Sequence, residues 1–376
     1  MLCCLSETAT GPAGPNGKEI EMKTIGVDLH KDQMTLAVLD EQGAVIRREE
    51  LATKCRNQIR EWFASYGTDC QVAVESVGFY QWFWDLFQPV VGKLVLADPA
   101  GLAPLRPRKQ AKTDRKDAEL LAQLLFQGRL PNAFVPPRAL RPLRELVRHR
   151  HSVARALALQ RRCLRWTMLK LNLPGPKTLS SDATQKWLLS QEGKFSPAQQ
   201  FVARQRLDQI VALERQLTDT ERLIEDAIAA DPGLTHRVQL LTSIPGIGPL
   251  VAVTILVETG DLTRFRHPGQ VGAYAGLTPR VHRSANTVHH GHISKMGPPI
   301  LRWVLQQAAW VAVRVDDHAR RHWLRISRRA GQKRASVAVA RKLLIYAWSV
   351  CRRNEPFHWP DQPVPETTTG GWSYSI

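Results

Sequence analysis

The feature that most constrains this chain is the position of four acidic residues in segments that otherwise predict ordered structure. Asp28 and Glu75 lie inside runs of aliphatic and β-branched residues that predict buried strands, and Asp114 and Asp117 open a predicted helix. Burying several carboxylates costs free energy unless a cation neutralises them. The pattern therefore predicts a divalent metal site, and hard oxygen ligands of this kind favour Mg²⁺ or Mn²⁺.

Each acid also has an ordinary structural explanation. Thr113 or Asp114 can cap the helix, and Asp117 can add favourable charge to its first turn. Asp28 can end a strand, and Glu75 can pair with an arginine. The four acids together, in the order strand, strand, helix, favour the metal interpretation. Two divalent ions about 4 Å apart stabilise the attacking and leaving oxygens of a phosphodiester, so phosphate chemistry is the expected use.

Charge indicates the class of partner. The chain holds 52 Lys and Arg against 34 Asp and Glu, a net charge of +18 over 376 residues. A protein this basic attracts polyanions, and nucleic acid is the expected one. No apolar run approaches the roughly 18 residues needed to span a bilayer, so we predict a cytoplasmic protein with no membrane partner.

The alternation of strand and helix patterns up to about residue 126 predicts an α/β domain, and longer helical patterns follow it. Prolines mark a boundary near residue 135. We predict a disordered leader at 1–22, an α/β domain at 23–135, a basic helical or coiled-coil segment at 138–235, a mainly helical domain at 236–353 and a disordered tail at 354–376.

The segment from Arg138 to Lys177 is a basic helix pattern with Glu145 as its only acid. Such a cationic face suits a nucleic-acid backbone, and its candidate ligands are Arg148, Arg161 and Arg162. A second long helix, from about 197 to 230, has apolar residues near heptad spacing. The two helices can pair with one another or with a partner chain, and both alternatives stay open.

The third region begins with two helix patterns joined by a Pro-Gly-Ile-Gly turn, typical of a helix-hairpin-helix. Gly246 and Gly248 would let backbone N–H groups approach a phosphate at the next helix N-terminus. The alternative is a tight helix connection without a ligand. A polar stretch from Gly276 to Gly297 follows, and further phosphate ligands are expected there, namely Arg280, His282, Arg283 and Lys295.

Together these segments resemble the IS110 group of insertion-sequence transposases, recombinases guided by a bridge RNA. The likeness extends from about Lys23 to Arg353. It rests on the four acids and on three phrases, Ser243-Ile-Pro-Gly-Ile-Gly, Ala273-Tyr-Ala-Gly-Leu-Thr-Pro-Arg and Ile293-Ser-Lys-Met-Gly. The resemblance implies an N-terminal RNase H-like (RuvC-like) domain that holds metal with the four acids, then a coiled coil and a C-terminal transposase domain.

The resemblance also implies a nucleophilic serine just after Leu-Thr-Pro-Arg, and Ser284 occupies that place. The residues alone do not separate Ser284 from Ser294. In the implied mechanism Ser284 attacks a DNA phosphodiester with the help of Mg²⁺ (or Mn²⁺) and forms a covalent phosphoserine. The implied partners are donor and target DNA, a structured guide RNA, and further copies of the chain in a dimer or tetramer.

Two other functions use the same residues differently. A metal-dependent RuvC-like junction resolvase or nuclease would employ the four acids with water as nucleophile. A non-catalytic nucleic-acid-binding protein would need only the basic surface. A covalent protein–DNA adduct distinguishes the serine recombinase from both the nuclease and the binding protein.

Overall fold

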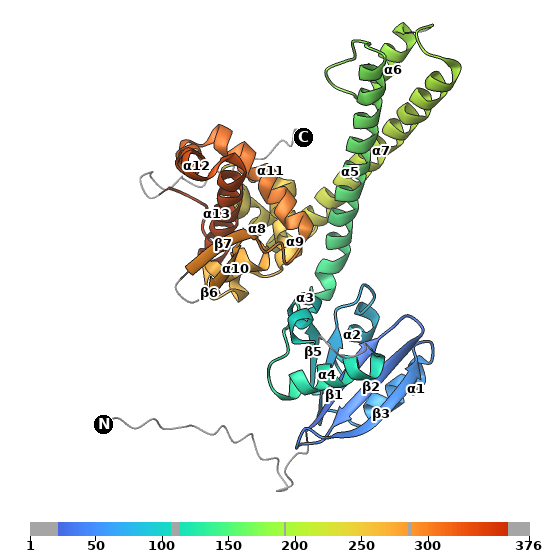
Figure 1. Cartoon of the computed structure of the whole chain (residues 1–376), viewed down its shortest axis with the longest axis vertical. Coiled ribbons are helices and arrows are strands. Elements are labelled where there is room, and N and C mark those ends of the chain that lie inside the picture. Colours follow the sequence, from blue (N-terminus) through green and yellow to red (C-terminus); the bar gives the residue numbers. More distant parts are fainter. Residues whose placement is uncertain (1–21, 107–112, 192, 285–286, 360–376) are drawn as a thin grey trace. The chain divides into compact units, whose positions relative to one another are not determined.

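The computed structural model describes residues 22–106, 113–191, 193–284 and 287–359, without the side chains of 281–290. The chain forms two compact units, Met1–Val135 and Pro136–Ile376 (Figure 1). The predicted disordered leader lies outside the described residues except for Met22, and so does the tail beyond residue 359. Within the described ranges, no helix has both the length and the apolar character that a membrane crossing requires.

The first unit is built on a five-stranded mixed sheet in the order β3-β2-β1-β4-β5. Its strands are β1 (Lys23–Leu29), β2 (Gln33–Leu39), β3 (Val45–Ala52), β4 (Cys70–Glu75) and β5 (Lys93–Ala97). The first three strands are antiparallel neighbours, whereas β4 and β5 run parallel to β1. Both the strand pattern and the alternation with helices follow the sequence, and the predicted α/β fold class is confirmed.

Helices cover both faces of this sheet. They are α1 (Arg56–Ala64), α2 (Gln81–Phe87), the short α3 (Pro99–Leu102) and α4 (Asp114–Phe126). Side chains alternate along a strand, so Ile25, Val27 and Leu29 of β1 share one core with α1 and α2. Gly26 and Asp28 therefore point to the opposite face, which α4 covers.

Gly26 is the residue that lets α4 approach β1. A Cβ atom at this position would lie 2.0 Å from the carbonyl oxygen of Ala118 and 2.6 Å from the amide nitrogen of Ala122. No side chain fits there, so the helix backbone rests directly on the strand. The contact brings the first turn of α4, with its two acids, over the end of β1 that carries Asp28.

The second unit begins with a long antiparallel helical hairpin. Helix α5 (Arg141–Lys170) packs along α7 (Pro197–Ala229), so the two helices pair with one another, which is one of the two alternatives that the sequence left open (Figure 1). The short helix α6 (Ser181–Ser190), which the sequence pattern did not predict, joins Leu164 and Ile210 in a separate core at the far end.

The rest of this unit is a helical domain with one large core. Its helices are α8 (Pro232–Thr242), α9 (Pro249–Thr259), α10 (Pro268–Tyr274), α11 (Pro299–Val315), α12 (Asp317–Ala330) and α13 (Gln332–Arg353). Leu143 of α5 and Ile224 of α7 belong to the same core. The near end of the hairpin is therefore built into the helical domain.

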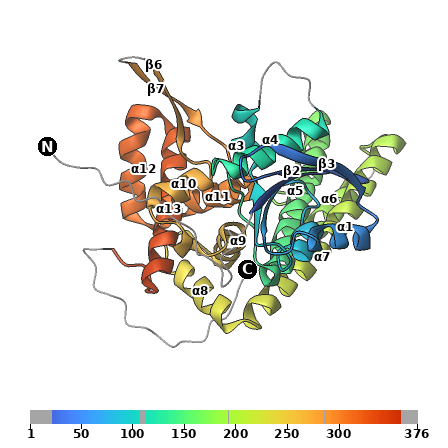
Figure 2. The same cartoon turned by 90° about the horizontal axis from the view of Figure 1, so that it is seen from below.

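The polar stretch before Ile300 is not a loop. It contains a two-stranded antiparallel hairpin of β6 (Pro279–Ser284) and β7 (Thr287–Ile293), which projects from the helices of this unit in Figure 2. Prolines, glycines and histidines hide the strand pattern in the sequence, because only a few β-favouring residues interrupt them. The polar stretch, to which the sequence assigned no secondary structure, therefore contains a β-hairpin.

The predicted disordered tail also needs a correction for its first six residues, 354–359. Phe357 is buried in the main core of the unit, and its backbone N–H donates a 2.7 Å hydrogen bond to Ser243 Oγ. The indole N–H of Trp359 donates to a carboxylate oxygen of Asp316 at 3.1 Å. Phe357 and Trp359 thus anchor this segment to the helical domain.

Candidate metal centre and nucleic-acid interface

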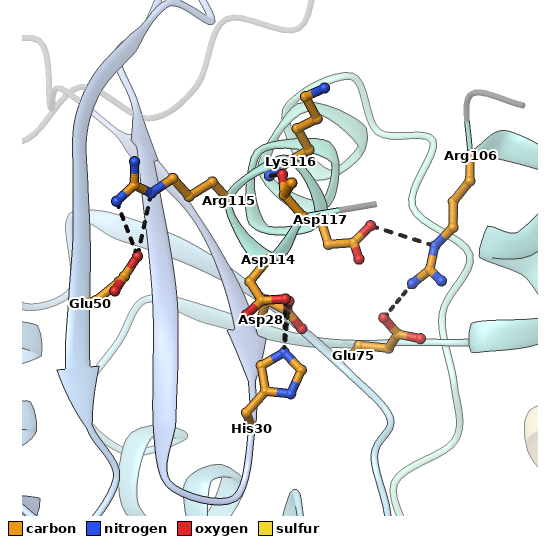
Figure 3. Close-up of polar contacts among 10 residues, drawn as sticks. Asp28, His30, Glu50, Glu75, Arg106, Asp114, Arg115, Lys116 and Asp117 are labelled. Carbon is orange, nitrogen blue, oxygen red and sulfur yellow. Dashed lines mark hydrogen bonds and ion pairs between the residues drawn. The ribbon is translucent and has the colours of Figure 1, made fainter. Parts of the chain in front are cut away.

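The four predicted acids gather at one end of the α/β unit (Figure 3). Asp28 is in β1, Glu75 is the last residue of β4, and Asp114 and Asp117 are in the first turn of α4. Strands β1 and β4 are parallel neighbours, so their carboxyl ends lie at the same edge of the sheet. The strand-strand-helix arrangement expected from the sequence is thus the arrangement found.

Asp28 and Asp114 meet through a histidine. His30 Nε2 lies 3.1 Å from Asp28 Oδ2 and 3.5 Å from Asp114 Oδ1. One ligand atom from each of the three residues lies within 4.8 Å of the others, a separation that one metal ion can bridge. His30 is part of the Asp-Leu-His sequence, and residues two apart on an extended strand point the same way. That spacing is the signal by which the sequence could have revealed His30.

Glu75 and Asp117 meet through an arginine. Arg106 Nη2 donates a hydrogen bond of 2.7 Å to Glu75 Oε2, and Arg106 Nε lies 3.8 Å from Asp117 Oδ1 (Figure 3). The structural alternative for Glu75, pairing with an arginine, is therefore present. No local pattern in the sequence predicted this partner, because Arg106 reaches the site only through tertiary folding.

Of the two candidate caps of α4, Thr113 and Asp114, the threonine provides the cap. Thr113, the N-cap of α4, accepts a hydrogen bond from the Lys116 N–H. Asp114 is left to face His30, and Asp117 is buried with 8% of its surface exposed. Because the threonine provides the cap, helix capping does not account for either carboxylate.

The electrostatics of Asp28 show that its charge is under-compensated. Burial is the main cause that raises the pKa of Asp28, and the like charges of Asp117 and Asp114 add to it. His30 opposes the shift by its charge and its hydrogen bond but does not cancel it. Asp28 thus lies near two further carboxylates whose charges oppose its ionisation.

This donor set suits a divalent cation. Carboxylate oxygens are the ligands that Mg²⁺ and Mn²⁺ prefer, and an imidazole nitrogen is compatible with Mn²⁺. A bound cation would supply the positive charge that the raised pKa of Asp28 shows to be missing. The residues present therefore fit the predicted metal.

The arginines predicted to bind nucleic acid along α5 have different surroundings. Arg148 donates two hydrogen bonds, of 2.7 and 2.9 Å, to the carboxylate of Glu258 in α9, and Arg144 donates a third at 3.0 Å. Glu258 is fully buried, and burial acts to raise its pKa. The hydrogen bonds and charges of the two arginines outweigh that effect and lower the pKa. Arg148 is therefore a partner of this buried acid, and phosphate contact by its exposed part stays a prediction.

Arg161 also has an internal partner, since its Nη2 lies 2.6 Å from Glu214 of α7. This ion pair holds the two hairpin helices together. Arg162, the next residue, faces outward and is exposed. Of the three arginines predicted on this helix, Arg162 is thus the one whose guanidinium is presented to solvent without a described carboxylate partner.

The two glycines of the predicted helix-hairpin-helix differ. Gly246 has φ +89°, and a Cβ atom there would lie 2.6 Å from the carbonyl oxygen of Ala308 in α11. Its lack of a side chain is needed for packing against α11, which supports the tight-connection explanation, and phosphate contact at Gly246 stays a prediction. Gly248 is exposed at the N-cap of α9 with open space around it, and phosphate contact there stays a prediction.

Ser284 is the last residue of β6, opposite Thr287 of β7, and its side chain is outside the description, as is that of Arg283. Lys295 is exposed at the base of the hairpin. Arg280 Nη2 donates to the backbone carbonyl of Ser294 at 3.2 Å and is also exposed. The acids belong to one unit and Ser284 to the other.

The two phrases around the hairpin pack directly on each other. A Cβ at Gly276 would lie 2.1 Å from the Met296 carbonyl oxygen, and one at Gly297 would lie 1.8 Å from the Tyr274 carbonyl oxygen. Both glycines have positive φ. The glycines of two distant sequence phrases thus serve one backbone contact that holds the hairpin base.

Two family models match separate parts of the chain, one with the four acids and one with Ser284. The model described as Transposase (DEDD_Tnp_IS110) matches residues 25–171, which include all four acids. The model described as Transposase IS116/IS110/IS902 family matches residues 238–324, which include Ser284.

The chain is similar over nearly its whole length to named transposases. It is 26% identical over 341 residues to a probable family 20 transposase of Pseudomonas aeruginosa, covering 89% of this chain and 98% of the relative. It is 26% identical over 349 residues to a transposase for insertion sequence element IS1111A of Coxiella burnetii, covering 90% and 92%. A pilin gene-inverting protein of Moraxella bovis is 33% identical over 144 residues, 38% of this chain and 45% of the relative. The chain belongs to the IS110 family of transposases, which are enzymes of DNA recombination.

Proposed function

We propose that this transposase is an RNA-guided DNA recombinase that cuts and rejoins DNA through a covalent phosphoserine, with the assistance of a divalent metal. The observation that carries the metal part is the cluster of Asp28, His30 and Asp114, whose ligand atoms lie within 4.8 Å of one another. The serine part rests on the place of Ser284 after Leu-Thr-Pro-Arg.

The first unit is proposed to be an RNase H-like (RuvC-like) domain. Three antiparallel strands followed by two parallel ones, with acids at the ends of β1 and β4, support this assignment. The following residues would form a coiled-coil segment at 138–235 and a transposase domain at 236–353. The shared core of the hairpin base and the helical domain implies that these two parts move together.

In the proposed site Asp28, Glu75, Asp114 and Asp117 hold Mg²⁺ or Mn²⁺. The cation, when bound, supplies positive charge to phosphodiester oxygens. His30 orients Asp28 and Asp114 by bridging their carboxylates. Arg106 supplies a second positive charge beside Glu75 and Asp117, and its guanidinium geometry also suits a phosphate oxygen.

In the proposed strand exchange, Ser284 Oγ forms a bond to phosphorus. The bond from phosphorus to a deoxyribose oxygen breaks, and that oxygen leaves with the proton of the serine. A hydroxyl of the partner strand later displaces the serine, which regains a proton. Each step breaks one phosphate ester bond and forms another, so the phosphate remains a diester throughout and the exchange needs no ATP.

The proposed partners are donor and target DNA, a structured guide RNA and additional copies of the chain. The net charge of +18 and the outward-facing arginines of α12, among them Arg321, Arg325 and Arg328, support polyanion binding. Sequence choice by base pairing would leave the protein to bind backbone and helix shape. Light scattering of the protein with its nucleic acids tests for a dimer or tetramer, and a strictly monomeric complex contradicts it.

The decisive experiment is strand transfer in vitro with full-length protein, RNA from the flanking element and paired DNA, with and without Mg²⁺. Ser284→Ala and Asp28→Ala should each abolish exchange. Ser294→Ala is the matched control, because the hydrogen bonds recorded for Ser294 use only its backbone. In a denaturing gel, labelled DNA should be retained with the Ser294→Ala protein. It should not be retained with the Ser284→Ala protein.

A fully active Ser284→Ala protein ends the phosphoserine proposal. Cleavage that depends on Mg²⁺ but gives no adduct would instead identify a metal-dependent resolvase or nuclease that uses water. Full site-specific activity of RNA-free protein would refute guidance by RNA.

A further inference from the structure

A groove of about 580 Å³ lies between the β6–β7 hairpin and helices α12 and α13. Its apolar walls come from three separate elements, and they include Leu277, Ile293, Ile326, Val337 and Ile345. A volume of this size lies within the range of sites that bind small organic groups. The groove is therefore large enough for a nucleotide and is apolar where a base would lie.

The rim of this groove is cationic. Four positively charged residues of α13 line it, namely Lys333, Arg334, Arg341 and Lys342, and no acid does. Among the described residues, none of the four forms an ion pair with a carboxylate. Unneutralised positive charge beside an apolar wall is complementary to a phosphate joined to a base.

Arg341 gives a second indication of a ligand. Its Nε is buried and has no hydrogen-bond partner, although buried polar groups are normally paired. The side chain lies against Gly272 of α10, where a Cβ atom would be 2.9 Å from that Nε. Because Gly272 has no side chain, the Arg341 guanidinium packs closely against α10 beside the groove.

His322 completes the wall on the side of α12. Burial lowers the pKa of His322, and the charges of Arg325 and Lys342 lower it further. These effects favour the uncharged imidazole, which lines the groove together with the apolar side chains. Aromatic and imidazole rings stack on unpaired bases without sequence preference.

We propose that this groove binds one unpaired nucleotide of the DNA strand that is cut, with the base between the apolar walls and its phosphate at Arg341 and Lys333. The assignment to DNA rests on the proposed function of Ser284, which ends the strand whose first residue, Pro279, lines the groove. Five residues of strand span about 17 Å. At about 3.4 Å per stacked nucleotide, the bound base lies up to about five nucleotides from the cut phosphate, and fewer if the strand is stretched.

The first test needs no catalysis. Full-length protein is titrated with dT12 and with a twelve-unit strand of the same phosphates that lacks bases. We expect the abasic strand to bind about tenfold more weakly, because contacts to bases are lost while the phosphates remain. Equal affinity for the two strands would overturn the proposal.

Variants then locate the effect. Ala338→Phe fills the groove and should remove the preference for dT12 while preserving binding of the abasic strand. Arg341→Gln should weaken the binding of both strands. Arg328→Gln removes an exposed charge of α12 that does not line the groove, and it should leave the ratio of the two affinities unchanged. An unchanged ratio in a folded Ala338→Phe protein places the base elsewhere and contradicts the proposal.

The source of the nucleotide is tested by cross-linking. A photoreactive 5-iodouracil is placed at each of the first eight positions beside the exchange point in DNA, and separately through the guide RNA. Cross-links to α13 from DNA positions within about five nucleotides are expected, whereas cross-links from RNA alone would overturn the DNA assignment. If the wild-type protein forms no serine adduct yet keeps its preference for dT12, the function proposed for Ser284 is refuted and the groove is left as a nucleotide site.

Discussion

Two buried carboxylates of this protein have opposite surroundings. Asp28 in the α/β unit faces Asp114 and Asp117, and its pKa is raised mainly by burial. Glu258 in the helical unit is more deeply buried, yet Arg144 and Arg148 lower its pKa. Burial alone therefore does not mark a reactive acid. The degree to which neighbouring cations neutralise the charge separates a site that needs a ligand from one that is complete without it.

The largest effect is expected when the under-compensated acid is neutralised. Asp28→Asn should lower strand-transfer activity by about 10³-fold, the scale for loss of one preorganised charged group. It should not lower the free energy of unfolding, because it relieves repulsion among buried acids. Glu50→Gln removes an exposed acid of the same sheet and should keep full activity. An active Asp28→Asn protein would contradict the distinction drawn between Asp28, which needs a cation, and Glu258, which does not.

The complementary change removes the two arginines that neutralise the buried charge of Glu258. The double variant Arg144→Ala/Arg148→Ala should lower the free energy of unfolding by about 3 kcal/mol, as measured by denaturant titration. Adding Glu258→Gln to the double variant should restore part of that loss, since no buried charge is left behind. If the triple variant is no more stable than the double variant, desolvation of Glu258 is not the cause.

The pH dependence of stability should differ between wild type and Glu258→Gln. The pKa of Glu258 in the folded state is below its ordinary value of 4.5, so its ionised form stabilises the fold above that pH. As pH falls below 4.5 and through the lowered folded-state value, this contribution is lost. The difference in unfolding free energy between the two proteins should thus shrink with falling pH. A constant difference would contradict the assignment.

The smallest effect concerns Arg106. Arg106→Gln removes a positive charge that pairs with Glu75 and lies near Asp117, so it should strengthen Mn²⁺ binding severalfold in equilibrium dialysis. Lys116→Gln, on the same helix as Asp117 but without a recorded ion pair, serves as the control. Weaker Mn²⁺ binding by the Arg106 variant would show that the arginine holds the acids in place instead of competing for them.

The location of the acids was predictable because local pattern and sheet topology determine it. Apolar alternation identified β1 and β4, and a polar start followed by leucines identified α4. Their convergence follows once β1 and β4 are parallel neighbours. His30 was within reach of the same reasoning, whereas Arg106 was not, because its position depends on the path of the chain after α3.

The packing partners of single basic residues and glycines could not be predicted in the same way. Arg148 looked like a surface cation because its partner, Glu258, is 110 residues away in an apolar helix. Gly246 has the conformation that a phosphate-binding turn would need, yet its contacts are with α11. Residue type and backbone freedom suit both uses, and only tertiary packing decides between them.

Arg144 and Arg148 attach one end of α5 to α9, so a small rotation at this attachment would produce a large displacement at the far end of the helical hairpin. From Arg148 to Lys170 the helix extends about 33 Å at 1.5 Å per residue. A tilt of about 5° at the attachment would move the far end by about 3 Å over that length. A repacking around Glu258 that tilted α5 by this amount would displace the hairpin tip by about the length of a hydrogen bond.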